Sequence, residues 1–247
     1  MTDRVLGVDL AAPVTEQLVA QVSAVLGQLP AFWGRYFTSI ATTGNVEYRH
    51  RIESPVLRAH GIRVLPIARQ TNRVGGTEAE GESDGLANGR DIVATFGEDY
   101  LVAQGARFFI FLDVEGSGLS RLSSAYYQGW VKGLGRSSVN VELLPCVYGI
   151  PGDSETWKVL DQAMKAGTPC HGLWMSHPVV SAEPVEWDSG KATPMGAVVD
   201  APVLFWQYMF PRAGLGCDRN QCNPIIDAAQ QILPRLILPS EVAELVA

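Results

Sequence analysis

The feature that most constrains the fold is a short apolar segment ending in two acids, RFFIFLDVEG at residues 107–116. A run this apolar and this short is typical of a strand buried on both faces, as in a parallel sheet. Because side chains alternate along a strand, Asp113 and Glu115 are predicted to share one face. That face also carries Phe109 and Phe111, whereas the opposite face is predicted to pack on helices through Phe108, Ile110, Leu112 and Val114.

Two carboxylates at the exit of a buried strand have two interpretations. Poor solvation and a nearby like charge raise the pKa of one of them, which is how an enzyme keeps an acid protonated beside an ionised partner. Alternatively, the acids cap the next helix or bind an arginine, since structural ion-pair networks also use such acids. For an isolated D-x-E motif the structural interpretation is the commoner one, so the other strand exits must decide.

Length and charge limit the class of protein. The chain has 247 residues, 47% of them hydrophobic and 18% charged, which fits one globular domain over residues 1–247 with a sizeable core. A net charge of -7 and the lack of a basic cluster argue against a nucleic-acid-binding protein. The sequence has no apolar run of transmembrane length and no signal-peptide pattern at its start, so we expect no membrane span and synthesis in the cytoplasm.

The cysteines and histidines predict neither a disulfide scaffold nor a metal site. The four cysteines are too few and too scattered for a disulfide framework, although Cys217 and Cys222 could bridge in an oxidising compartment. Their spacing is not that of a zinc site, and the four histidines do not complete one. No cofactor is predicted.

Alternating strands and helices predict a (β/α)8 barrel of the TIM type, in which the last strand is irregular. Besides 107–116, the predicted strands are residues 4–10, 32–37, 62–70, 141–149, 171–177, 203–208 and 215–220, the last of them short and polar. The predicted helices are residues 13–26 with Thr15 as N-cap, 46–59, 84–104, 119–134, 154–166 with Ser154 as N-cap, and 225–238. Residues 73–85, rich in glycine and acids, are predicted to form a long loop, either functional or simply solvated.

In such a barrel the active site lies where the strands end. The predicted exits carry polar and aromatic residues, namely Asp9, Arg35 or Tyr36, Arg69, Asp113, Glu115, Tyr148, Trp174, Gln207, Tyr208 and Asp218. Acids and aromatics together fit a sugar-binding cleft, because acids transfer protons and aromatic rings stack on sugars. Other interpretations stay open: Trp174 is more often a core residue, Arg69 can serve only to neutralise the acids, and an inward Gln207 would turn Tyr208 toward the helices.

Seven short motifs occur in an order that resembles a known family. They are G-V-D-L at 7–10, R-Y-F at 35–37, D-V-E at 113–115, V-Y-G at 147–149, L-W at 173–174, W-Q-Y at 206–208 and D-x-N at 218–220. Over nearly the whole chain this order resembles the lysozyme-like barrels of glycoside hydrolase family 25, and most closely their DUF1906 glycoside hydrolase-like relatives. Family 25 enzymes are N-acetylmuramidases, so the resemblance implies a glycan hydrolase acting on peptidoglycan or another N-acetylated glycan.

The resemblance also implies roles for individual residues. Glu115 matches the general acid and Asp113 its partner, while Asp9 and Asp218 match the flanking acids of the first and last strands. Tyr148, Gln207 and Tyr208 match cleft-lining positions. One departure is Arg219, which could neutralise the neighbouring Asp218.

Two alternatives to the hydrolase stay open at this point. The first is a glycan-binding barrel that has lost turnover, and the second is a metal-dependent hydrolase that uses the same acids as oxygen ligands for Mg²⁺ or Ca²⁺. In the hydrolase interpretation the protein would act at the cell wall after lysis or delivery, by a route that can involve a secretion or immunity partner.

Overall fold

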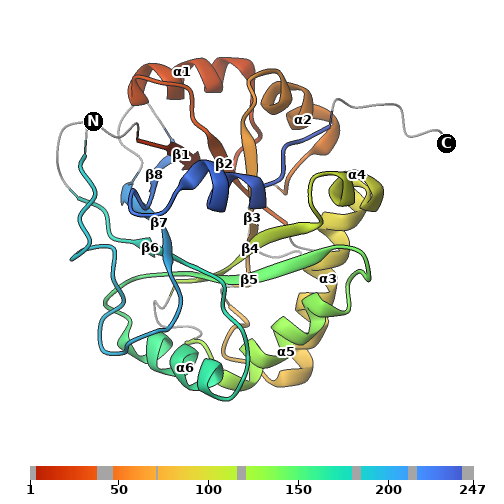
Figure 1. Cartoon of the computed structure of the whole chain (residues 1–247), viewed down its shortest axis with the longest axis vertical. Coiled ribbons are helices and arrows are strands. Elements are labelled where there is room, and N and C mark those ends of the chain that lie inside the picture. Colours follow the sequence, from red (N-terminus) through yellow and green to blue (C-terminus); the bar gives the residue numbers. More distant parts are fainter. Residues whose placement is uncertain are drawn as a thin grey trace.

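The barrel is closed by eight strands. The structure is a computed structural model that describes residues 4–37, 47–70, 72–115, 121–179, 185–210 and 216–240. Its strands follow one another around the barrel in chain order. They are β1 (Leu6–Asp9), β2 (Phe32–Tyr36), β3 (Arg63–Ala68), β4 (Arg107–Val114), β5 (Glu142–Gly149), β6 (Leu173–Ser176), β7 (Val203–Met209) and β8 (Asp218–Cys222) (Figure 1). The predicted TIM-type barrel is confirmed.

The last strand departs from the regular parallel pattern. Strands β1 to β7 pair in parallel, whereas β8 is antiparallel to both of its neighbours, β7 and β1. Within the described residues, α-helices follow only the first five strands, and no helix follows β6 or β7. The irregular last strand that the polar sequence of 215–220 predicts is therefore present. Its direction is the opposite of what an eightfold β/α repeat implies.

In the part of the chain that the structure describes, six α-helices surround the wall, at the top, right and bottom of Figure 1. They are α1 (Glu16–Leu26), α2 (His50–Ala59), α3 (Glu78–Phe96), α4 (Glu98–Ala103), α5 (Ser124–Gly135) and α6 (Ser154–Lys165). Thr15 caps α1 as predicted, since its side chain accepts a hydrogen bond from the Leu18 N–H. The predicted Ser154 cap is wrong, because the side chain of Asp153 caps α6 through the Thr156 N–H. None of the helices in these ranges is long and apolar enough to cross a membrane.

The predicted loop at residues 73–85 is wrong from Glu78 onward, where α3 begins. Thr77 and Glu80 form a capping box at its start. Further along, Glu82 forms ion pairs with Lys132 and Arg136 of α5. Buried Asp84 accepts a hydrogen bond from the Tyr126 hydroxyl at 2.8 Å and also pairs with Arg73. The acids of this segment therefore join α3 to its surroundings and do not line a cleft.

The glycines that suggest a loop allow α3 and α5 to touch along their backbones. A Cβ atom on Gly85 of α3 would lie 2.1 Å from the carbonyl oxygen of Trp130, and one on Gly129 of α5 would lie 2.0 Å from that of Glu78. Gly81 and Gly133 are in the same situation, so glycines spaced four residues apart line both sides of the contact. A helix interior normally disfavours glycine by about 1 kcal/mol relative to alanine, and here the close approach of the two helices requires it.

Gly129→Ala should therefore destabilise the protein, against the usual helix preference. The added methyl group has no room, and overpacking of this kind costs about 1–3 kcal/mol or more. The matched control is Gly135→Ala at the end of the same helix, where a Cβ atom would meet nothing within 4 Å. Chemical denaturation of both variants checks this. Equal stabilities for the two variants would contradict the close helix contact.

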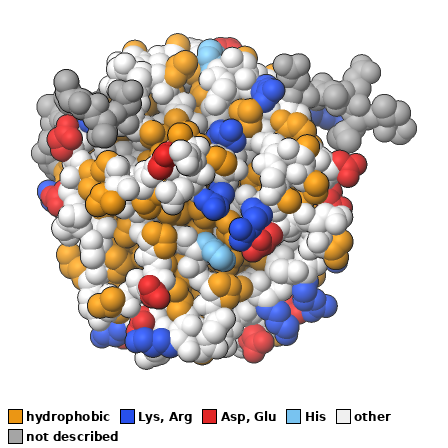
Figure 2. Space-filling view, in the orientation of Figure 1, with side chains coloured by type: hydrophobic (Ala, Val, Ile, Leu, Met, Phe, Trp, Pro, Cys, Tyr) orange, Lys and Arg blue, Asp and Glu red, His pale blue; other side chains and the backbone are white. Residues whose placement is uncertain are grey.

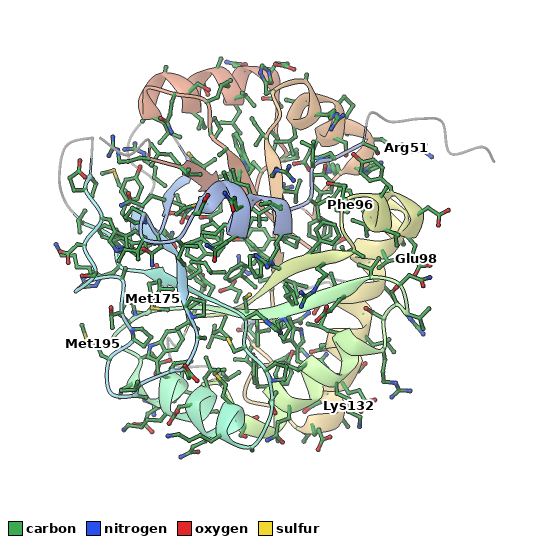
Figure 3. The ribbon with its side chains drawn as sticks, viewed as in Figure 1. Arg51, Phe96, Glu98, Lys132, Met175 and Met195 are labelled. Atoms are coloured by element: carbon green, nitrogen blue, oxygen red, sulfur yellow. The ribbon has the colours of Figure 1, made fainter. Side chains whose placement is uncertain are left out.

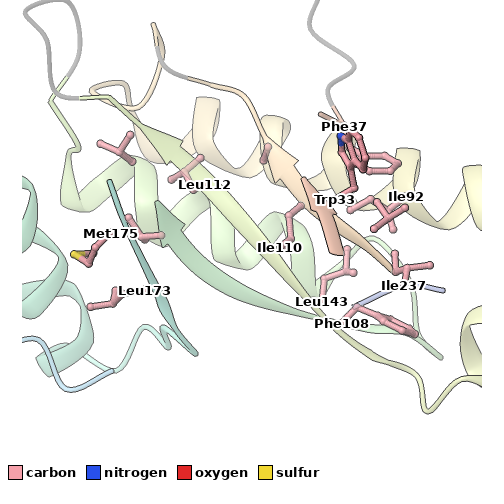
Figure 4. Packing of buried hydrophobic residues seen from close by; sticks show 14 of the residues in the cluster. Trp33, Phe37, Ile92, Phe108, Ile110, Leu112, Leu143, Leu173, Met175 and Ile237 are labelled. Atoms are coloured by element: carbon pink, nitrogen blue, oxygen red, sulfur yellow. The ribbon is translucent and has the colours of Figure 1, made fainter. Parts of the chain in front are cut away.

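Apolar residues form two layers, one inside the barrel and one between the wall and the helices. Phe109 and Phe111 point inward, where Phe111 packs edge-on against Trp174 with ring centroids 5.6 Å apart. Phe108, Ile110, Leu112 and Val114 belong to the outer layer, part of which is shown in Figure 4. The predicted alternation along β4 is thus confirmed, and it places Asp113 on the inner face.

A short irregular helix closes the end of the barrel opposite Asp113. The predicted helix at residues 225–238 is instead a π-helical turn, η1 (Ala228–Ile232), followed by a 3-10 turn, η2 (Leu233–Arg235). Pro234 is the physical reason, because proline cannot continue an α-helix from its interior. Ile232 packs into the inner layer and Arg235 lies over the Phe109 ring. The blue ribbons of this segment cross the middle of Figure 1. Figure 2 shows the same face of the molecule, where apolar and charged side chains are mixed. Figure 3 shows that side chains fill the interior of the molecule in this view.

Candidate active site

Four carboxylates meet in one pocket at the opposite end of the barrel. The pocket is lined by Asp9, Tyr36, Ile67, Asp113, Glu115, Tyr148, Trp174 and Asp218, and the space within it, including the part open to solvent, is about 270 Å³. Asp9 and Asp113 lie at the ends of β1 and β4, and Glu115 directly follows β4. The structure therefore brings together seven of the residues predicted from strand exits, with Ile67 of β3 as an unpredicted apolar member.

Asp218 reaches the pocket by a route different from the predicted one. It is the first residue of β8, not a residue at its exit. Because β8 runs antiparallel, its start lies where the other strands end, and Asp218 pairs with Asp9 across the sheet. The predicted position is correct, while the reasoning that placed it there assumed the wrong strand direction.

Burial and mutual repulsion dominate the electrostatics of the pocket. Asp9 is 5% exposed and Asp113 is 2% exposed, whereas Glu115 is half-buried at the mouth. Burial raises the pKa of Asp9 well above its usual value, and the negative charge of Asp218 raises it further. A hydrogen bond from Asn220 acts in the opposite direction on the Asp9 pKa. A pocket like this favours cationic or proton-accepting groups.

Asp218 also has a perturbed pKa. Burial raises it to about 6, the charge of Glu115 adds to this effect, and a hydrogen bond with the Gln207 side chain opposes it. Arg219 does not neutralise Asp218 in the way that the sequence suggests. Its guanidinium contacts the Met209 sulfur at 2.8 Å. Because the next residue along the strand, Asn220, faces inward, the Arg219 side chain faces outward.

Asp218→Asn should stabilise the protein at neutral pH. The folded pKa of about 6 lies above that of an unfolded aspartate, so the folded state binds this proton more tightly. Stability from this group is complete below about pH 4 and is lost as the pH rises through the folded pKa. We expect the variant to gain on the order of 1–3 kcal/mol above about pH 7 and to match wild type near pH 4. Thermal unfolding across this range measures the difference, and a gain that does not depend on pH would contradict it.

Aromatic residues form one wall of the pocket. The Tyr148 hydroxyl donates a hydrogen bond to Gln207 Oε1 at 2.6 Å, and its ring packs edge-on against Trp174 with centroids 4.8 Å apart. Burial and the neighbouring acids raise the pKa values of Tyr148 and Tyr36, so both hydroxyls stay protonated and can donate. Trp174 belongs to the inner core and also lines the pocket.

Three predicted site residues lie outside the pocket lining. Gln207 is buried behind it and supports Tyr148 and Asp218. Arg69 lies over the Tyr36 ring, with its guanidinium carbon 5.4 Å from the ring centroid. Tyr208 belongs to the outer layer beside Trp206, because an inward Gln207 turns its neighbours toward the outside. The expectation that Tyr208 lines the cleft is therefore not met.

Two further expectations from the sequence are settled by strand geometry. Arg35 faces the outside of the barrel, where its guanidinium pairs with Glu53, so Tyr36 is the member of this pair that reaches the pocket. Cys217 and Cys222 are buried and not bridged, since Cys217 lies in the outer layer and Cys222 in the inner one. Within the described ranges, no group of three or more His, Cys, Asp or Glu side chains is arranged to hold a metal ion.

Asn220 is a buried polar residue beside the pocket that the predicted site residues do not include. Its side chain joins Trp174 to Asp9, with a bond of 2.9 Å to the former and 2.7 Å to the latter. The signal in the sequence is the D-x-N spacing, since period-2 alternation puts Asn220 on the same face as Asp218.

Two solved structures share this fold. A 1.07 Å crystal structure of an uncharacterized B. stearothermophilus protein aligns with 94% of this chain and 99% of its own, at a TM-score of 0.68 and 22% identity. The catalytic domain of the endolysin ply40, from bacteriophage P40 of Listeria monocytogenes, aligns with 95% of this chain and 99% of its own, at a TM-score of 0.52 and 16% identity. No family model matches the chain, and no curated protein matches it in sequence. At these identities the likeness concerns the fold.

Proposed function

We propose that this protein is a glycoside hydrolase that cleaves bacterial peptidoglycan in the manner of an N-acetylmuramidase. The observation that carries the proposal is the carboxylate arrangement: Glu115 is half-buried at the pocket mouth, and Asp113 is buried one strand repeat below it on the same face. The endolysin catalytic domain, which has the same overall fold, supports a substrate in the bacterial cell wall. The place of action is then the wall, reached after lysis or delivery.

The proposed chemistry assigns a different task to each acid. Glu115, which solvent and a substrate can reach, gives its proton to the oxygen that leaves when the glycosidic bond breaks. Buried Asp113 and Asp9 stabilise the positive charge that develops on the sugar ring, because electrostatic attraction is stronger where water is excluded. The rings of Tyr36 and Tyr148 offer apolar faces and hydroxyl donors to the sugar.

Digestion of purified peptidoglycan tests the proposal. Wild-type protein should release reducing sugars, and mass spectrometry of the fragments should find muramic acid at the new reducing ends. Glucosamine at those ends would keep a glycosidase but change the bond that is cut. Protein that sediments with peptidoglycan and releases nothing would be a glycan-binding barrel. If the protein neither binds nor cuts peptidoglycan, its likeness to the endolysin domain would concern the fold and not the substrate.

A further inference from the structure

Asp9 is held by a hydrogen-bonded chain that crosses three strands of the barrel. The indole N–H of Trp174 on β6 donates to Asn220 Oδ1 at 2.9 Å, and Asn220 Nδ2 on β8 donates to Asp9 Oδ2 on β1 at 2.7 Å. Trp174 is 1% exposed, Asn220 is 0% exposed and Asp9 is 5% exposed. Buried polar groups of this kind are costly unless all their partners are present, so the three side chains stabilise one another's positions.

The donor chemistry gives this chain a single direction. An indole N–H can only donate, so it occupies the oxygen of the Asn220 amide and leaves the NH₂ group to face Asp9. The NH₂ group in turn needs an acceptor, which Asp9 Oδ2 supplies as long as that oxygen carries no proton. Trp174 thus turns the NH₂ group of Asn220 toward Asp9, and this favours an Asp9 carboxyl group whose Oδ2 carries no proton.

The backbone holds this geometry firmly. Asn220 pairs with Gly7 of β1 on one side and with Gln207 of β7 on the other, so it cannot move without breaking the barrel wall. Asp9 is fixed from the other side by β2, because a Cβ atom on Gly34 would lie 2.6 Å from the Asp9 Cβ. Strand residues packed in this way hold functional groups more precisely than loops do.

We infer that Asn220 is a positioning residue, which holds the Asp9 carboxylate in one orientation as a hydrogen-bond acceptor, and that Trp174 fixes the direction of the Asn220 amide. The effect on turnover rests on the proposed function, whereas the effect on Asp9 itself does not. The bond works against an acidic setting. The titratable groups that face Asp9 in the pocket are Tyr36, Asp113, Glu115, Tyr148 and Asp218, and Cys217 lies close enough on the outer side to interact with its charge.

The test is a carboxyl titration by ¹³C NMR of protein labelled at aspartate, with the Asp9 signal identified through Asp9→Asn. Asn220→Leu keeps roughly the size of the side chain and removes both hydrogen bonds without adding a charge beside Asp9, and Asn220→Ala removes the side chain beyond Cβ. Loss of a charge-assisted hydrogen bond should move the Asp9 titration midpoint to higher pH by about one pH unit or more. The indole N–H signal of Trp174 should move in both variants, because neither leucine nor alanine offers the side-chain acceptor that Asn220 Oδ1 provides.

Asn223→Leu is the matched control, since Asn223 follows the far end of β8 and bonds to the Val203 carbonyl outside the pocket. It should leave the Asp9 midpoint unchanged. If Asn220→Ala fails to fold, Asn220→Leu decides the question. An unchanged Asp9 midpoint in a folded Asn220→Leu variant would overturn the inference and leave Asn220 a purely structural residue.

Activity adds a separate readout. If peptidoglycan is cleaved, the acid limb of the kcat/KM profile should move to higher pH with the Asp9 midpoint in the Asn220 variants. The reason is that turnover needs ionised Asp9, which is then present over a narrower pH range. A limb that stays in place while the midpoint moves would overturn the link to turnover. Wild-type protein that cleaves nothing would reject the proposed function and leave the titration result standing.

Discussion

Glu115→Gln is expected to lower peptidoglycan cleavage by about 10²–10⁴-fold, the contribution that a positioned general acid makes. Glutamine keeps the size and hydrogen-bonding reach of the side chain but has no proton to give to the leaving oxygen. Glu115 lies half-buried at the mouth of the pocket, so the exchange removes no core packing and the variant should unfold at the wild-type temperature. Reducing-sugar release, measured together with thermal unfolding, separates lost chemistry from lost structure.

Glu155→Gln is the matched control for this experiment. Glu155 is an exposed residue of α6 that pairs with Lys158, and it lies outside the pocket lining. Its variant should cleave at the wild-type rate. Full activity of Glu115→Gln would refute the assignment of the general acid even if the protein proved to be a peptidoglycan hydrolase, and attention would then move to Asp113.

Much of the site could be predicted because strand periodicity is a local property. The alternation in residues 107–116 placed Asp113 on the inner face, and the exits of the other strands placed Asp9, Tyr36 and Tyr148 around it. The rule that active sites lie at the carboxyl ends of barrel strands then needed only the strand order to bring these residues together. Each of these steps uses information within a few residues of the side chain concerned.

The features that could not be predicted depend on contacts between distant segments. Glycines at 81 and 85 suggest a loop until the facing glycines of α5 show that two helices touch there. The direction of β8 depends on its pairing with β1 and β7, which no local pattern in residues 217–222 encodes. The role of Asn220 is hidden for the same reason, since its two partners lie 46 and 211 residues away along the chain.

A buried ion pair on the outer side of the barrel joins the first two β/α units. Arg35 of β2 and Glu53 of α2 are both 0% exposed and share two hydrogen bonds, of 2.7 and 3.0 Å. The arginine also donates to the carbonyl oxygens of Leu10 and Ala11, and Glu53 accepts the backbone N–H of Val14. The charges are thus fully hydrogen-bonded, which is the condition under which a buried pair can be tolerated.

Glu53→Ala should destabilise the protein by about 3–5 kcal/mol, because it leaves the Arg35 charge buried without its partner. A loss of this size is a large fraction of the stability of a typical domain, so the variant should be largely unfolded in mild denaturant. The matched control is Glu142→Ala, which removes the glutamate of another two-bond pair, with Arg107, whose side chains are 54% and 53% exposed. Water solvates Arg107 when its partner is lost, so the denaturation midpoint of that variant should hardly change. If both variants lost the same stability, burial would not be what makes the Arg35–Glu53 pair important. If only Glu53→Ala lost stability, burial would be the difference between the two pairs, and it is the buried pair that also holds the residues directly after Asp9, because Arg35 donates to the Leu10 carbonyl oxygen.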